Sequence, residues 1–199
     1  MNVAILILNY NGKELLMSYL DSVLAHKDDA EVWVVDNGST DRSLHVIKKN
    51  FPEVKILALD KNYGYAKGYN LAVSNIDADL YCFLNNDVRV CSDWISPMLQ
   101  LFETKQQLGF AQPKIVSEQD ESIFEYSGAA GGHLDLFGFP YCRGRYLYYC
   151  EKDQGQYDTP EKVTWASGAA LWVRKTAFNQ LGGFDERFFM HFEEIDLCL

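Results

Sequence analysis

Three clusters of polar side chains each follow a short apolar run in the sequence, and their residue types suit the binding of a charged ligand. They comprise Asn9 with Asn11, Asp36 with Asp41, and Asn85 with Asn86 and Asp87. In open α/β sheets, ligands lie outside the carboxyl ends of the strands, so clusters that are far apart in sequence can converge there. Carboxylate and amide oxygens are hard ligands, and Asp87 with Asn85 nearby suits Mg²⁺ or Mn²⁺.

A fourth cluster, Glu193, Glu194 and Asp196, lies close to the end of the sequence. A positioned carboxylate can act as a general base toward a hydroxyl nucleophile. Acidic residues are also favoured in the first turn of a helix, where they offset the helix dipole while remaining solvated. The residues alone leave a catalytic and a structural interpretation open.

The sequence lacks both of the glycine-rich loops that bind phosphate in nucleotide-binding folds. The turn after the first apolar run is Asn9-Tyr10-Asn11-Gly12, without the GxGxxG pattern, and no GxxxxGK[ST] occurs. The chain has 18 Lys and Arg against 28 Asp and Glu, a net charge of −10, so we expect no nucleic-acid partner. A diphosphate bound in such an acidic crevice needs a bridging divalent cation.

Apolar runs and amphipathic segments alternate from residue 3 to about residue 116. Continuous apolar runs are typical of strands buried on both faces, and apolar residues at helical spacing indicate helices between them. We predict strands over residues 3–8, 31–36, 54–59, 80–84 and 109–116, with helices over residues 13–25, 42–50, 64–75 and 93–105. This alternation predicts a mostly parallel, doubly wound α/β sheet in a single domain.

The second part of the chain departs from this alternation. Residues 118–158 are rich in Gly, Tyr and Phe, which predicts ordered loops and short irregular strands, and a loop this long is usually functional. A strand over residues 163–174 and a helix over residues 175–181 follow, with Gly182 and Gly183 as the helix cap. Residues 191–199 have the character of the first turns of a helix, which we expect to be incomplete.

The number of cysteines and the N-terminal residues indicate the cellular compartment of the protein. The five cysteines, an odd number without a CxxC pair, predict reduced thiols and a cytosolic protein. The apolar run at residues 3–8 is too short for a signal peptide or a membrane span. We therefore expect a cytoplasmic protein, with any membrane contact peripheral and at the inner face of the membrane. The oligomeric state is not predicted by the sequence.

Seven segments resemble the motifs of family 2 glycosyltransferases, in the same order and across essentially the whole chain. The first four are ILNYN at residues 7–11, VVDNGSTD at 34–41, NYGYAKGYN at 62–70 and LNND at 84–87. The last three are SGA at 167–169, GGFDERFF at 182–189 and FEEID at 192–196. The similarity is strongest to rhamnosyltransferase-like members that build bacterial surface polysaccharides.

The resemblance implies the A-type glycosyltransferase fold, with a nucleotide-sugar-binding half at residues 1–116 and an acceptor-side half at residues 117–199 that is incomplete at its C-terminus. It implies that Asp36 hydrogen-bonds a pyrimidine base and that Asp87 coordinates the metal bridging the diphosphate, with Asn85 in place of the first aspartate of the DxD motif. The implied donor-side residues are Asn9, Asn11, Asp36, Asp41, Asn62, Asn70, Asn85 and Asn86. Asp41 has an alternative role as the cap of the following helix.

The same resemblance points to Glu194 as the catalytic base, because the family pattern is Glu-Asp with the second acid as the base. Asp196 and Glu193 are the alternatives. The longer side chain of Glu194 moves the carboxylate by roughly 1 Å, which is enough to affect the rate. The implied acceptor-side residues are Trp165, Ser167 and Gly168, although Trp165 also suits a core position.

The implied reaction moves a sugar from a UDP- or dTDP-linked donor to a glycan or lipid-linked glycan by a single inverting displacement. The metal would stabilise the departing diphosphate as a Lewis acid. Candidates for acceptor contacts are Tyr141, Tyr146, Tyr148, Tyr149, Arg143 and Arg145, with loop packing and solvated charge as the alternatives. Two other functions stay open: a non-catalytic nucleotide-sugar-binding module, and a sugar nucleotidyltransferase, which generally has a basic glycine-rich loop after its first strand.

Overall fold

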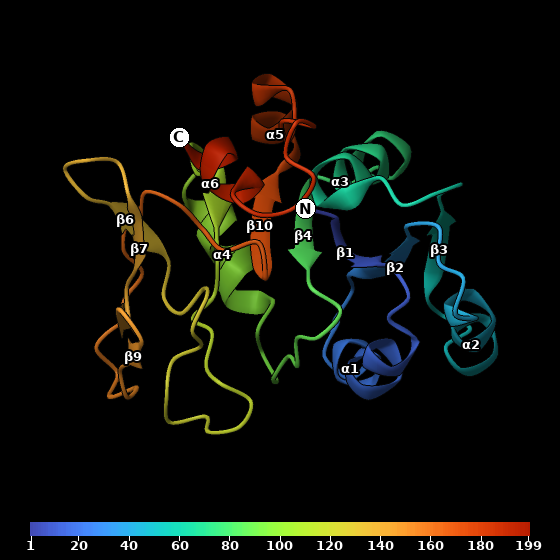
Figure 1. Ribbon diagram of the computed structural model, residues 1–199, viewed down its shortest axis with the longest axis horizontal. Helices are drawn as coiled ribbons and strands as arrows, with labels where there is room; N and C mark the ends of the chain where they lie inside the picture. The colour runs from blue at the N-terminus through green and yellow to red at the C-terminus, as the bar shows by residue number, and fades with distance from the viewer.

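A six-stranded sheet forms the centre of the protein in a computed structural model that describes all residues from 1 to 199 (Figure 1). Its strand order is β3-β2-β1-β4-β10-β5. The strands are β1 (Val3–Asn9), β2 (Glu31–Asp36), β3 (Lys55–Ala58), β4 (Leu80–Leu84), β5 (Phe110–Ala111) and β10 (Ala170–Arg174). The first four run parallel to one another, whereas β10 is antiparallel to both β4 and β5. The mostly parallel α/β sheet predicted from the sequence is therefore confirmed.

Helices cover both faces of the sheet. One face carries α1 (Lys13–Ala25), α2 (Ser43–Asn50) and α4 (Ser96–Thr104), and the other carries α3 (Gly64–Asn75), α5 (Lys175–Leu181) and α6 (Glu193–Cys198) (Figure 1). Each face of the sheet packs against its helices in a separate hydrophobic core, and successive residues of a strand point into opposite cores. Cys82 of β4 lies in the core beneath α1, α2 and α4, and Phe83 lies in the core beneath α3, α5 and α6. Burial on both faces explains why β4 is a continuous apolar run in the sequence.

Three predicted elements have different bounds in the structure. The strand expected over residues 109–116 is only Phe110–Ala111, which fits the lack of an N–H donor at Pro113. The helix expected over residues 93–105 begins at Ser96 with a proline in its first turn, and Asp93 has a left-handed backbone with φ of 59°. The strand expected over residues 163–174 is confined to β10, and the residues before it form a loop.

Residues 112–169, between β5 and β10, form an insertion with two small hairpins. These pair β6 (Gly132–Leu134) with β7 (Pro140–Cys142), and β8 (Arg145–Tyr146) with β9 (Tyr149–Cys150). Both hairpins lie at one edge of the molecule, beyond the α4 and β10 side of the sheet (Figure 1). The insertion has a small core of its own that contains Phe124, Ala129, Cys142 and Trp165.

All five cysteines are unpaired. None of the helices combines the length and the apolar character that crossing a bilayer requires.

Candidate active site

The fully buried side chain of Asn9 joins the carboxyl ends of three neighbouring strands. Its Nδ2 donates to Asp36 Oδ1 and to Ser39 Oγ, each at 3.1 Å, which links β1 to the end of β2. Its Oδ1 accepts from Asn86 Nδ2 at 3.3 Å, which links β1 to the turn after β4. The three polar clusters of the sequence therefore meet at one edge of the sheet, as expected from the parallel strand order.

Asp36 and Asn11 continue this network. Asp36 is buried, and its Oδ2 accepts from the backbone N–H of Ser39 at 3.1 Å. The backbone of Asn11 is left-handed, with φ of 53°. Its N–H donates to Ser39 Oγ at 2.9 Å, and its Oδ1 accepts from Thr40 N at 2.7 Å. The loops after β1 and β2 thus support one another at the expected donor site.

Asp41 is engaged by the backbone of two helices. One carboxylate oxygen accepts from Lys13 N at 2.9 Å, at the start of α1, and the other accepts from Ser43 N at 3.0 Å, at the start of α2. Burial raises the pKa of Asp41, but hydrogen bonds from Ser43 and Lys13 outweigh it and leave the pKa below its ordinary value. These contacts match the capping alternative for Asp41.

Asn62 is held together with Asn37, a residue that the sequence analysis did not single out. Asn37 is buried, and its Nδ2 donates to Asn62 Oδ1 and to Gly64 O, each at 3.0 Å. Its Oδ1 accepts from Tyr63 N at 2.9 Å. Asn37 follows directly after Asp36, and this position at a strand end was the available signal. The pair fixes the segment that leads into α3.

Asn85 and Asp87 lie in the turn that follows β4. The N–H of Asn85 donates to Ala169 O at 3.0 Å, which brings this turn beside the start of β10. Asp87 is exposed and makes no hydrogen bond or ion pair within the protein. No group of three or more His, Cys, Asp or Glu side chains is arranged to hold a metal ion. One free carboxylate with an amide neighbour fits a cation that arrives with a diphosphate, because Mg²⁺ commonly binds one or two carboxylates together with substrate phosphates and water.

The acids of α6 are not a solvated helix turn. Glu193 is only 4% exposed, and its Oε2 is buried without a hydrogen-bond partner. Glu194 is partly buried, whereas Asp196 is exposed. Burial raises the pKa of both Glu193 and Glu194, and hydrogen bonds from backbone N–H groups offset this shift only in part. Raised pKa values bring a carboxylate closer to the range that suits a general base at neutral pH.

The segment before α6 is strained. His191 and Phe192 have φ values of 76° and 70°, a left-handed conformation that non-glycine residues rarely adopt. Such backbone persists only where the surroundings determine it strongly, and it is concentrated at functional sites. The strain therefore supports a functional role for the acids that follow.

Residues 167–169, the predicted acceptor-side segment, lie between the turn after β4 and α6. Gly168 O accepts from Tyr65 Oη at 2.8 Å, and a Cβ added at Gly168 would lie 3.8 Å from Glu194 Cβ. Ser167 is buried, and its N–H donates to Gln112 Oε1 at 2.5 Å. Gly168 is thus the residue of this segment that faces the predicted base.

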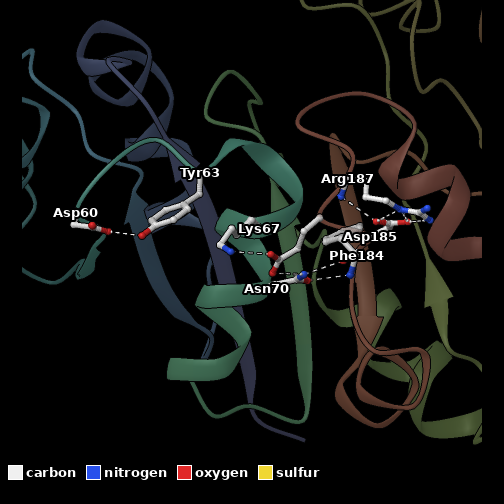
Figure 2. Close-up of polar contacts among 8 residues, drawn as sticks. Asp60, Tyr63, Lys67, Asn70, Phe184, Asp185 and Arg187 are labelled. Atoms are coloured by element: carbon white, nitrogen blue, oxygen red, sulfur yellow. Dashed lines mark hydrogen bonds and ion pairs between the residues drawn. The ribbon is translucent and has the colours of Figure 1, made fainter.

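Two residues assigned to the site from the sequence have other partners. Trp165 is a core residue, buried in the small cluster of the insertion, with its Nε1 donating to His133 O at 3.1 Å. Asn70 uses both ends of its amide on the backbone of Phe184, where Nδ2 donates to Phe184 O and Oδ1 accepts from Phe184 N, each at 2.9 Å (Figure 2). In a helix the side chain of Asn70 points away from the turn that precedes α3, so proximity in sequence did not predict its direction.

The candidate acceptor residues of the insertion divide into two groups. The exposed tyrosines are Tyr141, Tyr146, Tyr148 and Tyr149. Arg143 is paired with Glu161 at 2.5 Å, and the guanidinium of Arg145 lies 4.1 Å from the ring centroid of Tyr126. The tyrosines are therefore free to contact another molecule, whereas both arginines already have partners.

A cavity of about 770 Å³ lies elsewhere, between α4, β5 and residues 157–166. It contains none of the donor-side residues and none of the acids of α6, and it approaches the site through Trp165, Ala166 and Cys198 of α6. The convergent polar network, and not this volume, locates the candidate active site.

The sequence matches glycosyl transferase family 2 over residues 4–182. The chain belongs to this family. It is 28% identical over 190 residues to N-acetylglucosaminyl-diphospho-decaprenol L-rhamnosyltransferase of Mycobacterium tuberculosis. This alignment covers 87% of this chain and 61% of that protein. It is 25% identical over 204 residues to the rhamnosyltransferase WbbL of Escherichia coli, and this alignment covers 99% of this chain and 75% of that protein. The rhamnosyltransferase-like resemblance is confirmed, and the chain spans less than two thirds of the mycobacterial relative.

Solved structures of glycosyltransferases share the fold. The mannosyltransferase PcManGT from Pyrobaculum calidifontis, solved with GDP-Man and Mn²⁺, matches with a TM-score of 0.63 at 16% identity, over 93% of this chain and 48% of that one. Residues 1–349 of S. aureus TarS, solved with UDP-GlcNAc, match with a TM-score of 0.68 at 17% identity, over 100% of this chain and 52% of that one. These matches confirm the A-type glycosyltransferase fold.

The buried carboxyl of Glu193 predicts a dependence of stability on pH. An acid whose pKa is higher in the folded than in the unfolded protein stabilises the fold fully below the unfolded value, and that stability is lost as the pH rises through the folded value. We expect Glu193→Gln, which cannot ionise, to gain free energy of unfolding relative to wild type as the pH rises above the ordinary glutamate pKa of about 4.3, as measured by urea denaturation. A constant difference over this rise in pH would contradict a raised pKa for Glu193.

Proposed function

We propose that this protein is an inverting, metal-dependent glycosyltransferase that moves a sugar from a UDP- or dTDP-linked donor to a glycan or lipid-linked glycan in the synthesis of a cell-surface polysaccharide. The observation that carries the proposal is a chain of close approaches. The turn that contains Asp87 lies beside residues 167–169, since Asn85 N–H donates to Ala169 O at 3.0 Å, and Gly168 in turn lies close to the partly buried Glu194. Family membership and the rhamnosyltransferase relatives support the reaction class.

The proposed reaction is a single displacement at the anomeric carbon. Glu194 accepts the proton of the acceptor hydroxyl as its oxygen attacks, and the nucleoside diphosphate departs from the opposite face of the sugar. A divalent cation held by Asp87, with Asn85 beside it, would stabilise the charge of the departing diphosphate. The hydrogen-bonded ends of β1 and β2 would orient the nucleoside, with Asp36 toward the base.

Loss of the Asp87 carboxylate should remove metal-dependent nucleotide binding. Wild type should be stabilised by UDP or dTDP with Mn²⁺, by roughly 2.7 kcal/mol at a hundred times the dissociation constant, which raises the melting temperature by several degrees. Asp87→Ala should lose the Mn²⁺-dependent part of this shift. The exposed Asp21→Ala on α1 is the matched control and should keep it. An unchanged shift in Asp87→Ala would exclude this residue as the metal ligand.

Neutralising the base should separate binding from transfer. Glu194→Gln is expected to keep the nucleotide-dependent thermal shift and to lose transfer by about 10²–10⁴-fold, the usual contribution of a general base. Asp196→Asn, on the exposed side of α6, should retain transfer. The reverse pattern would make Asp196 the base. If wild type binds a nucleotide sugar but transfers nothing in any acceptor screen, the non-catalytic binding module is the better description.

We also propose that the protein works at a membrane surface, because one relative is named for a decaprenol-linked acceptor. The tip of the β6–β7 hairpin presents Leu136, Phe137 and Phe139 with exposed fractions of 101%, 86% and 68%. Asp135 Oδ1 fixes this tip by accepting from Phe137 N at 2.8 Å and Phe139 N at 2.9 Å. A fixed, convex apolar tip suits insertion into the interfacial region of a bilayer, where aromatic side chains are favoured.

This placement predicts a specific loss of lipid binding. Each fully inserted apolar side chain contributes about 1.5–3 kcal/mol. The double variant Leu136→Ser with Phe137→Ser should therefore lose most co-sedimentation with vesicles of phosphatidylglycerol and phosphatidylcholine. Leu181→Ser, an exposed leucine on α5, is the matched control. Equal vesicle binding by wild type and the double variant would assign the tip another partner.

A further inference from the structure

The segment that brings Glu193 and Glu194 to the site has no regular secondary structure. It runs from the end of α5 through residues 182–192 and enters α6 through the left-handed pair His191 and Phe192. A segment of this kind needs contacts from outside itself to hold one conformation. The polar contacts that hold this one from outside come mainly from one helix, α3.

The strongest of these contacts is made by Asn70, in the second turn of α3. Its side-chain amide donates to Phe184 O and accepts from Phe184 N, each at 2.9 Å (Figure 2). The approach is close enough that a Cβ added at Gly183 would lie 2.6 Å from Asn70 Oδ1, and Gly183 has φ of 82°. An amide is suited to this pairing because it offers one donor and one acceptor side by side, as a neighbouring strand would.

Packing reinforces the same point of attachment. Phe184 is buried, and its ring lies 5.4 Å from the rings of Phe83 and Phe178 and 5.8 Å from that of Tyr65, measured between centroids. The backbone of Phe184 is therefore fixed by Asn70 on one side and by an aromatic cluster on the other.

Two further contacts continue toward the acids. Lys67 Nζ pairs with Glu186 at 2.9 Å, one turn of α3 before Asn70. The backbone N–H of Tyr65 donates to Phe189 O at 2.7 Å, four residues before α6 begins at Glu193. Gly64 lies against Phe189 so closely that a Cβ there would collide with it. Contacts from Tyr65, Lys67 and Asn70, over the first two turns of α3, thus hold the segment along this helix.

We propose that Asn70 is a positioning residue that holds the segment at residues 182–192 against α3, and through it Glu194, and that it does not bind the donor. The statement that Asn70 positions Glu194 for catalysis rests on the proposed function, in which Glu194 is the base. The first turn of α3 is also tied to the donor edge, because Asn37 Nδ2 donates to Gly64 O at 3.0 Å. α3 is therefore the common reference for the donor edge and for the base.

Hydrogen–deuterium exchange tests this assignment without a substrate. Asn70→Ala removes both hydrogen bonds, so the amides of residues 184–192 should exchange roughly tenfold faster or more. The amides of residues 37–41 at the donor edge should exchange as in wild type. Asn75→Ala is the matched control, an exposed asparagine of the same helix whose amide bonds only to Leu71 O at 2.8 Å. Unchanged exchange at residues 184–192, or an equal increase at residues 37–41, would overturn the proposal.

A second variant keeps the test decisive if Asn70→Ala folds poorly. Asn70→Asp keeps the acceptor for Phe184 N but replaces the donor to Phe184 O with a second oxygen. The new oxygen faces Phe184 O and Glu186 Oε1, to which Asn70 Nδ2 donates at 2.9 Å and 3.4 Å, so the variant should also speed exchange of the same segment. The exposed Asn75→Asp should leave this segment unchanged.

Transfer rates complete the test. Because a misplacement of about 1 Å can cost on the order of 100-fold, Asn70→Ala should lower kcat by about that factor, with UDP or dTDP and Mn²⁺ binding as in wild type. Faster exchange with an unchanged kcat would overturn the positioning role. Absence of transfer in wild type would instead count against the proposed function, and the exchange experiment would still decide whether Asn70 holds the segment.

The pH profile distinguishes positioning from a general loss of stability. Glu194 faces His191 and Glu193 from its own segment, Tyr65 from α3, and Cys142 and Cys198. Burial raises its pKa, so release of the segment should hydrate the carboxyl and move the acid limb of kcat toward lower pH. An acid limb at the wild-type position in Asn70→Ala would contradict the proposed link from Asn70 to Glu194.

Discussion

The side-chain amide of Asn9 has no contact with water, and a buried amide is stable only when its donors and acceptor are satisfied within the protein. Its partners come from the ends of β2 and β4, so three strands are joined at one edge. The same requirement constrains the turn after β1, because a Cβ at Gly12 would lie 2.6 Å from Asn9 Oδ1. The donor side is therefore organised by a buried polar network and not by a glycine-rich phosphate loop.

The acceptor side is organised differently, around α3. Tyr65 contacts both the segment at residues 182–192 and the segment at residues 167–169, through its N–H to Phe189 O and its hydroxyl to Gly168 O. Because Asn37 holds the first turn of α3 to the end of β2, the positions of the acids and of Gly168 are defined relative to the donor edge. A strained entry into α6 is tolerated because these contacts determine it.

The sequence predicted the elements whose signals are local. The bounds of β2, α3 and β4 agree with the prediction because each apolar run or helical pattern ends at a clear polar or glycine signal. The direction of β10 could not be predicted, because an apolar run has the same appearance in a parallel and an antiparallel strand. Asn70 was assigned to the donor side because it belongs to the same motif as Asn62, but a helix turns these two side chains to different partners. Trp165 was grouped with Ser167 by proximity, whereas long-range packing buries it in the insertion.

The antiparallel course of β10 also affects how this fold can change over evolutionary time. The chain leaves the sheet at β5 and returns at β10, and these two strands are neighbours. The residues between them form an insertion that leaves and re-enters the sheet at neighbouring positions. Its length can vary at small entropic cost, since each doubling of a loop costs only about 0.6 kcal/mol. Residues 118–158 can therefore be exchanged for a different module that alters what the protein recognises, while the donor edge, Gly168 and the acids of α6 are kept.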